Sequence, residues 1–234
     1  GLPTDGAHPL KELAFGRGGR LYINVGSASD ACRNDQQKQP LPCPETTGAQ
    51  PRAAVYVAEL GGPGHTLQSL RAHATGLRNS LGLAAVPTAT GGERLWQAEN
   101  SVDYADAKLP AEELNELSPG SHHGWPAHVA PLQLLAVPPA AAGHAAQPWS
   151  GRLLAVWHGY RAQGQRIVAW RLGPDGRPQG PRENIVSGWS AMPGLRPLGN
   201  PAGATVDSQG RLWVVEDRNR TVLVVALQAA EASR

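Results

Sequence analysis

The chain has 234 residues, which is enough for one sizeable domain and short for two. Its formal charge is only +2 and no basic run mixes with aromatic residues, which argues against a nucleic acid partner. No apolar stretch approaches the roughly 18 residues of a membrane span, because prolines interrupt the longest candidate, Val129 to Ala142. With 28 Gly and 21 Pro, the composition favours an all-β fold with many turns.

Four segments of the chain share one pattern. Each begins with a turn that contains Gly or Ser, continues with Arg-Leu, and then alternates like a half-buried strand. The turn allows the chain to reverse, and the strand then enters a buried sheet. The four segments are Gly18 to Val25, Gly92 to Ala98, Ser150 to Val156 and Gln209 to Val215.

Further short strands are predicted around these segments, and one stretch, Pro110 to Leu117, has a helical pattern. A recurring order of strand, turn, strand, loop and strand is typical of propeller blades, whereas a sandwich would not repeat the same opening four times. At roughly 40–50 residues a blade, the chain supplies about four blades of a β-propeller. The flanking strands are Leu10 to Phe15, Ala54 to Leu60, Arg166 to Leu172, Gly203 to Asp207 and Thr221 to Leu227.

The two cysteines, Cys32 and Cys43, flank a polar loop that contains proline. A disulfide that closes this loop is predicted, and it would indicate an oxidising compartment, so that the protein is periplasmic or secreted. Two free thiols are the alternative. The start at Gly1 shows no basic region or apolar core of a signal peptide, and it reads like the middle of a fold.

Arg78 and Asn79 form a polar pair among small and apolar residues, without a surrounding charge cluster. Such a pair suits a packed loop whose two side chains face a group that needs hydrogen-bond donors, such as a carboxylate or a quinone oxygen. The alternative is that both side chains brace the loop by bonding backbone carbonyls.

Five motifs in this order resemble the soluble quinoprotein glucose/sorbosone dehydrogenase family, and most closely its sorbosone dehydrogenase-like branch. The resemblance runs over essentially the whole chain. It implies a six-bladed β-propeller that binds pyrroloquinoline quinone (PQQ) and calcium at the top of its central channel. Residues 1–234 would then form a single propeller domain that covers about the last four blades and lacks the opening ones. The motifs are Gly1-Leu2-Pro3 with His8 and the strand Leu21 to Ser27, Ala74 to Asn79, Leu95 to Asn100, Gly124 to Pro126, and His128 to Leu132.

The resemblance also implies roles for individual residues. His8 matches the general base that removes a hydroxyl proton from the sugar while hydride passes to the quinone. Arg78 and Asn79 match the pair that contacts the quinone, and the guanidinium would stabilise negative charge on the reduced cofactor. Backbone carbonyls near Ser101 and Val102 match calcium ligands. A surface or capping role is the alternative for His8.

The chain departs from the family where a Lys and two closely spaced Arg grip the quinone. At the Lys position His158 or Arg161 could substitute, and near the missing Arg pair Arg196 is the nearest candidate. His128, in the last motif, is the remaining candidate for cofactor binding.

The function expected from the resemblance is PQQ-dependent oxidation of a sugar or sugar aldehyde. Electrons would pass on to an acceptor such as a cytochrome or a quinone. Two other classes remain open. One is a calcium-dependent propeller lactonase in which carboxylates activate water, and the other is a non-catalytic propeller that serves as a binding surface.

Overall fold

The computed structural model describes residues 1–36, 38–40, 42–99, 114–125, 133–140, 147–158, 165–189 and 199–225. Within these residues the protein is built from β-strands with two short 3₁₀ turns, η1 (Arg17–Gly19) and η2 (Pro44–Thr46). No helix among them is long and apolar enough to cross a membrane.

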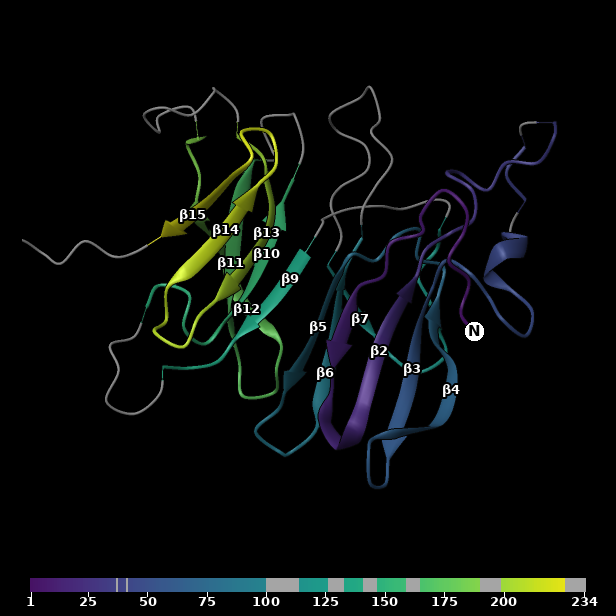
Figure 1. Ribbon diagram of the computed structural model, residues 1–234, viewed down its shortest axis with the longest axis horizontal. Helices are drawn as coiled ribbons and strands as arrows, with labels where there is room; N and C mark the ends of the chain where they lie inside the picture. Colours follow the sequence, from purple (N-terminus) through teal and green to yellow (C-terminus); the bar gives the residue numbers. More distant parts are fainter. Residues whose placement is uncertain are drawn as a thin grey trace, which may run out of the picture. The chain divides into compact units, whose positions relative to one another are not determined.

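The strands form four sheets (Figure 1). Antiparallel pairing joins β1 to β4 in sequence, β5 to β7, β10 to β11, and β13 to β15. The sheet orders are β1-β2-β3-β4-β8, β5-β6-β7, β12-β11-β10-β9 and β13-β14-β15. The short strand β8 differs in pairing parallel to β4. The strands are β1 Leu13–Phe15, β2 Arg20–Val25, β3 Ala54–Gly61, β4 Thr66–Thr75, β5 Gly82–Pro87, β6 Glu93–Ala98, β7 Leu114–Leu117, β8 Ser121–His122, β9 Gln133–Val137, β10 Arg152–Trp157, β11 Arg166–Leu172, β12 Pro178–Val186, β13 Pro201–Val206, β14 Leu212–Glu216 and β15 Thr221–Val225.

The four Arg-Leu segments lead into the second strands of the four sheets, β2, β6, β10 and β14. Each of these strands has a neighbour on both sides, so its backbone groups are paired along both edges. Three of the four motif leucines, Leu95, Leu153 and Leu212, are buried. The repeated pattern therefore marks a repeated structural unit, as the sequence predicted.

The chain divides into two compact units, the first comprising Gly1–Leu134 and Leu172–Pro178, and the second the rest. In the first unit, one apolar cluster joins the sheets β1–β4 and β5–β7. β3 is buried at five successive positions because it lies inside its sheet and is covered on both faces. The cluster contains Tyr22, Val55, Val57, Ala74, Leu77, Leu83, Leu95 and Leu117.

In the second unit, two tryptophans and the inward residues of β10, β11 and β14 form the core. Trp149 and Trp189 are almost fully buried, and large aromatic side chains contribute much apolar area to a small core. The same core contains Leu154, Val156, Ile167, Leu212 and Val214.

The predicted helical segment Pro110 to Leu117 is wrong over its described part, because Leu114–Leu117 forms strand β7. β7 pairs with β6, where Leu117 lies opposite Leu95 and Leu114 opposite Ala98. The pairing gives β7 backbone partners and buries Leu117, and this tertiary gain outweighs the helical preference of its residues.

Candidate functional site

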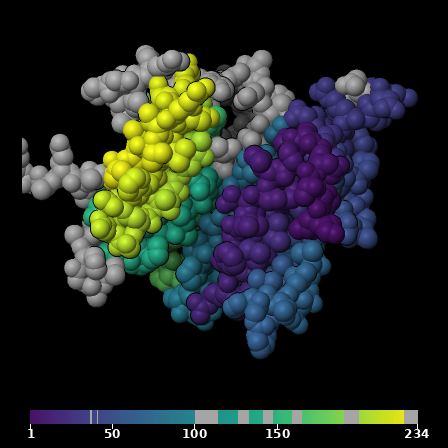
Figure 2. Space-filling model, in the orientation of Figure 1, coloured from purple at the N-terminus to yellow at the C-terminus, as the bar shows by residue number. Residues whose placement is uncertain are grey.

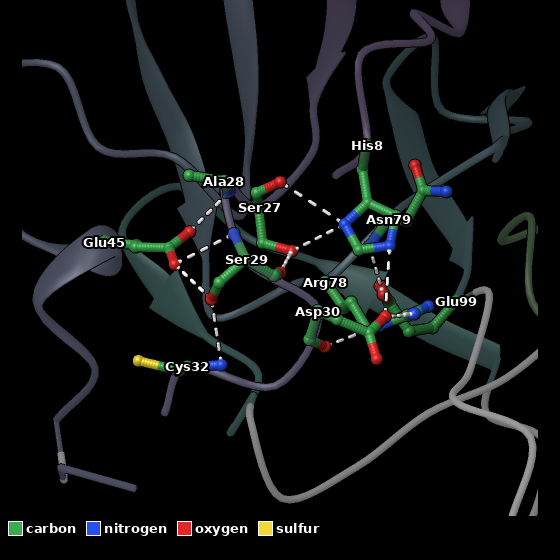
Figure 3. Close-up of polar contacts among 10 residues, drawn as sticks. All are labelled: His8, Ser27, Ala28, Ser29, Asp30, Cys32, Glu45, Arg78, Asn79 and Glu99. Atoms are coloured by element: carbon green, nitrogen blue, oxygen red, sulfur yellow. Dashed lines mark hydrogen bonds and ion pairs between the residues drawn. The ribbon is translucent and has the colours of Figure 1, made fainter. Parts of the chain in front are cut away.

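Three loops of the first unit meet at the ends of its strands. They are the segment 1–12 before β1, the loop 26–53 between β2 and β3, and the loop 76–81 between β4 and β5. Backbone hydrogen bonds join them: Ala7 N donates to Ala28 O at 2.8 Å, and Ser27 N donates to Arg78 O at 2.8 Å. The predicted residues His8, Arg78 and Asn79 are thereby brought together (Figure 3).

His8 is held by the serine at the end of β2. Its Nδ1 lies 2.8 Å from Ser27 Oγ, and that hydroxyl donates its own proton to Ser29 O at 2.7 Å. Because the hydroxyl has one proton and already donates it, it accepts a hydrogen bond from Nδ1–H. The neutral imidazole is therefore protonated at Nδ1, and Nε2 carries the free lone pair that a base requires.

Gly26 permits this approach between the His8 loop and β2. A Cβ added at Gly26 would lie 2.5 Å from His8 Cβ and 2.6 Å from His8 O, closer than real Cβ contacts occur. Only glycine therefore allows the two backbones to come this close.

His8 is 9% exposed. Burial lowers the pKa of His8, because it disfavours the charged imidazolium, and the positive charge of Arg78 lowers it further. The Ser27 carbonyl, Asp30 and Glu45 act in the opposite direction. The net shift is downward, so His8 is neutral at pH 7 and is available as a base.

Arg78 is 7% exposed, and its guanidinium bonds Asp30 at two points. Nε donates to Asp30 O at 3.0 Å, and Nη2 donates to Asp30 Oδ1. The same carboxylate atom lies 3.8 Å from His8 Nε2. Arg78 and His8 therefore share one acidic neighbour (Figure 3).

A buried carboxylate, Glu99, fixes the loop that carries Arg78 and Asn79. It accepts hydrogen bonds from Asn79 N at 2.5 Å, Ser80 Oγ at 3.2 Å and Gln97 Nε2 at 2.6 Å. Burial raises the pKa of Glu99 to about 7, although these donors and Arg78 oppose the rise. Glu99 thus fixes the orientation of the loop that carries Arg78 and Asn79.

Asn79 is 5% exposed, and its side chain meets Asn24 of β2. Asn24 Nδ2 lies 3.5 Å from Asn79 Oδ1 and 3.3 Å from Leu10 O. Asn24 Oδ1 is buried and has no hydrogen-bond partner within the part of the chain that the structure describes. The site therefore holds a buried polar atom that no described residue satisfies.

The predicted disulfide between Cys32 and Cys43 is confirmed, with a Cα–Cα distance of 6.1 Å. Glu45 also stabilises this loop, because it accepts hydrogen bonds from Ala28 N at 2.5 Å and Ser29 N at 3.1 Å. Cys32, Cys43 and Glu45 lie close enough to share a metal ion. Because both sulfur atoms are in the disulfide, they cannot serve as thiolate ligands.

His158, predicted to contact the cofactor, follows β10 in the second unit. Its Nε2 lies 2.9 Å from Asp217 Oδ2. The other predicted residues lie outside the described residues, namely Ser101, Val102, His128, Arg161 and Arg196.

Several polar residues of the site were not singled out from the sequence, among them Ser27, Asp30, Glu45 and Glu99. Two of them had a signal, because Ser27 and Glu99 stand inside the motifs that carry the family resemblance. Asp30 and Glu45 had none, because each meets its partner across an irregular loop without a periodic pattern.

No protein-family model and no curated protein matches the chain. Solved structures do match. The chain is 19% identical to a protein of Carbohydrate-Active Enzymes Family AA12 from Trichoderma reesei, with a TM-score of 0.65 over 94% of this chain and 68% of that one. A calcium structure of the Trichoderma reesei family AA12 matches with 20% identity and a TM-score of 0.62. The match covers 94% of this chain and 69% of that one.

Two further solved structures are similar. For the PQQ domain of a pyranose dehydrogenase from Coprinopsis cinerea, in its holo form, the identity is 17%, the TM-score 0.63, and the shares 94% of this chain and 70% of that one. For the soluble aldose sugar dehydrogenase from Escherichia coli, in its apo form, the identity is 13%, the TM-score 0.56 and the shares 91% and 62%. At these identities the likeness shows the fold alone.

Proposed function

We propose that this chain, which has a PQQ sugar dehydrogenase-like β-propeller fold, oxidises a sugar or sugar aldehyde of the sorbosone or aldose type with PQQ as cofactor. One observation carries the proposal. A neutral histidine with its Nε2 lone pair free, a buried arginine and a buried asparagine lie in one cluster at the ends of the strands.

The residues of this cluster fit a quinone that bears carboxylates. Arg78 and Asn79 supply hydrogen-bond donors on a loop fixed by Glu99, and donors of this kind suit carbonyl and carboxylate oxygens. Asn24 Oδ1 beside them has no partner among the described residues, which supports a further polar group in the site. When bound, PQQ would accept the hydride from the substrate carbon.

His8 would act as the general base of the oxidation. Its Nε2 takes the proton of the substrate hydroxyl, while Nδ1–H stays bonded to Ser27 Oγ and keeps the ring oriented. The lowered pKa of His8 keeps the ring neutral at pH 7. Arg78 then offers a fixed positive charge, which would stabilise negative charge that develops beside it.

Calcium would be held near Ser101 and Val102, whose backbone carbonyls are suitable hard ligands. The calcium structure of the family AA12 neighbour supports a calcium site. His128, His158, Arg161 and Arg196 remain the proposed additional contacts to the cofactor. Electrons would pass to an external acceptor such as a cytochrome or a quinone, and the disulfide supports a periplasmic or secreted location.

Residues 1–234 would belong to a single propeller domain. The chain spans 68–70% of the family AA12 and pyranose dehydrogenase structures and 62% of the aldose dehydrogenase. Leu13 and Phe15 point outward from β1 and are 51% and 75% exposed. A neighbouring blade would cover such a face.

Titration of the purified protein with PQQ and calcium tests the proposed function. The expected result is a bound chromophore whose absorbance changes when an aldose is added, and weaker binding in Arg78→Ala. Asp35→Asn, in an exposed part of the disulfide loop, serves as the control. Absence of a bound, sugar-reducible chromophore would contradict the proposal, and lactone hydrolysis without quinone would support the hydrolase instead.

A further inference from the structure

One exposed carboxylate, Asp30, lies beside both His8 and Arg78 of the proposed site. Its backbone oxygen and Oδ1 accept hydrogen bonds from the Arg78 guanidinium. Oδ1 also lies 3.8 Å from His8 Nε2, the atom that would take the substrate proton. Nδ1 on the far side of the ring is already bonded to Ser27, so Asp30 is on the reactive side.

The position of Asp30 is set by a network in the preceding residues. Glu45 binds the backbone nitrogens of Ala28 and Ser29, together with the Ser29 hydroxyl. Ser29 Oγ in turn accepts a hydrogen bond from Cys32 N at 2.9 Å. Asp30 therefore lies on a segment that is bonded on both sides, and the disulfide closes the loop just beyond it.

The charges around His8 oppose one another. Arg78, from the loop after β4, disfavours a proton on His8, whereas Asp30 and Glu45, from the loop after β2, favour it. Of the two carboxylates, Asp30 has an oxygen near Nε2, and it also engages the arginine. Removing the charge of Asp30 would leave Arg78 without this partner beside the imidazole.

We propose that Asp30 is a positioning residue that holds Arg78 beside the site and makes His8 a stronger base. The inference rests on the proposed function, in which His8 Nε2 receives the hydroxyl proton of the substrate. As that proton arrives, the imidazolium lies next to the Asp30 carboxylate, which stabilises the positive charge. Arg78 meanwhile keeps its orientation, since Asp30 fixes two of its nitrogens.

The test measures the pKa of His8 by NMR titration of the whole 234-residue chain, with the His8 signals assigned by their loss in His8→Gln. Asp30→Asn should lower the pKa by about half a unit to one unit, as expected for a charge roughly 4 Å away in largely aqueous surroundings. Asp35→Asn removes the same charge from the same loop at an exposed position and should leave the pKa unchanged. Equal His8 pKa values in Asp30→Asn and Asp35→Asn would overturn the proposal.

A second variant, Asp30→Glu, separates the effect of the charge from any loss of stability in Asp30→Asn. Asp30→Glu keeps the charge and changes only its reach, so its His8 pKa should lie between those of the parent and Asp30→Asn. If Asp30 merely braced the loop, both variants would lower the melting temperature while the His8 pKa stayed at the parent value.

The pH dependence of PQQ-dependent turnover separates this inference from the proposed function. In Asp30→Asn the acid limb of the profile should move to lower pH together with the His8 pKa. A shifted pKa in a chain without any turnover would refute the proposed reaction and leave the role of Asp30 intact. Normal turnover with an unmoved acid limb would refute the role of Asp30 alone.

Discussion

At the scale of residues, the site depends on one histidine whose two ring nitrogens have different surroundings. Nδ1 is bonded to Ser27, whereas Nε2 faces Asp30, the carboxylate that also pairs with Arg78. This asymmetry follows from a hydroxyl that already donates its proton to Ser29 O. A surface histidine, which was the alternative from the sequence, would have neither the burial nor the fixed tautomer.

The lowered pKa of His8 predicts how stability depends on pH. The ordinary pKa of an imidazole is about 6.5, and the pKa of His8 in the folded chain is lower. Just below pH 6.5, His8 is therefore protonated in the unfolded chain and still neutral in the folded chain. Stability should therefore fall as the pH drops from 6.5 toward the folded pKa, and His8→Gln should lose less stability over this range than the parent. Urea unfolding at pH 7 and pH 5 measures both.

His65→Gln is the control for that comparison, because His65 is exposed. It should show the same pH dependence as the parent. If His8→Gln also matched the parent, His8 would not be the buried neutral group described above.

Some residues of the site could be predicted from the sequence and others could not. His8, Arg78 and Asn79 were found because each stands in a short motif, and the structure brings all three together. Asp30 and Glu45 were not found, because their roles depend on how an irregular, disulfide-closed loop folds back onto β2 and the loop after β4. Such contacts leave no spacing rule in the sequence.

At the scale of elements, the second strand of each sheet was predicted from its repeated pattern, whereas β4 and β12 were not predicted. β2, β6, β10 and β14 carry the Arg-Leu pattern and a buried alternation. β4 is exposed at five of its first six positions, and β12 is exposed at most of its positions and begins with a proline at a sheet edge. Without a buried face, neither strand shows the alternation that identifies a strand.

The outward face of β1 gives a prediction at this scale. Leu13 and Phe15 alternate with the buried Ala14, so they share one exposed apolar face, and the N-terminal segment that contains them is open to view in Figure 2. Replacing both with Ser should reduce self-association of the chain, because exposed apolar patches drive contact between copies. Sedimentation velocity at several protein concentrations measures the effect.

Leu67→Ser is the matched control, since it removes an exposed leucine from β4, away from β1. If the β1 variant associates as strongly as the parent and this control, the outward face of β1 is not an uncovered packing surface. The proposal that a neighbouring blade covers this face would then lose its support.

At the scale of the whole molecule, the propeller was predictable because one strand pattern recurs four times, and each occurrence opens the second strand of a sheet. The solved structures confirm that fold class. The last sheet also has an outward apolar face, with Val215 opposite Val222 and Val224 nearby, all exposed. The first and last sheets thus each present a face that a further blade could cover.

Turnover per bound PQQ in His8→Gln tests most directly whether His8 is the base of a PQQ-dependent oxidation. Binding of PQQ should be nearly unchanged, while turnover with an aldose falls by about 10²–10⁴-fold, the usual contribution of a positioned base. The control His65→Gln, which removes an exposed imidazole, should keep the parent turnover. Unchanged turnover per bound PQQ in His8→Gln would show that His8 is not the base.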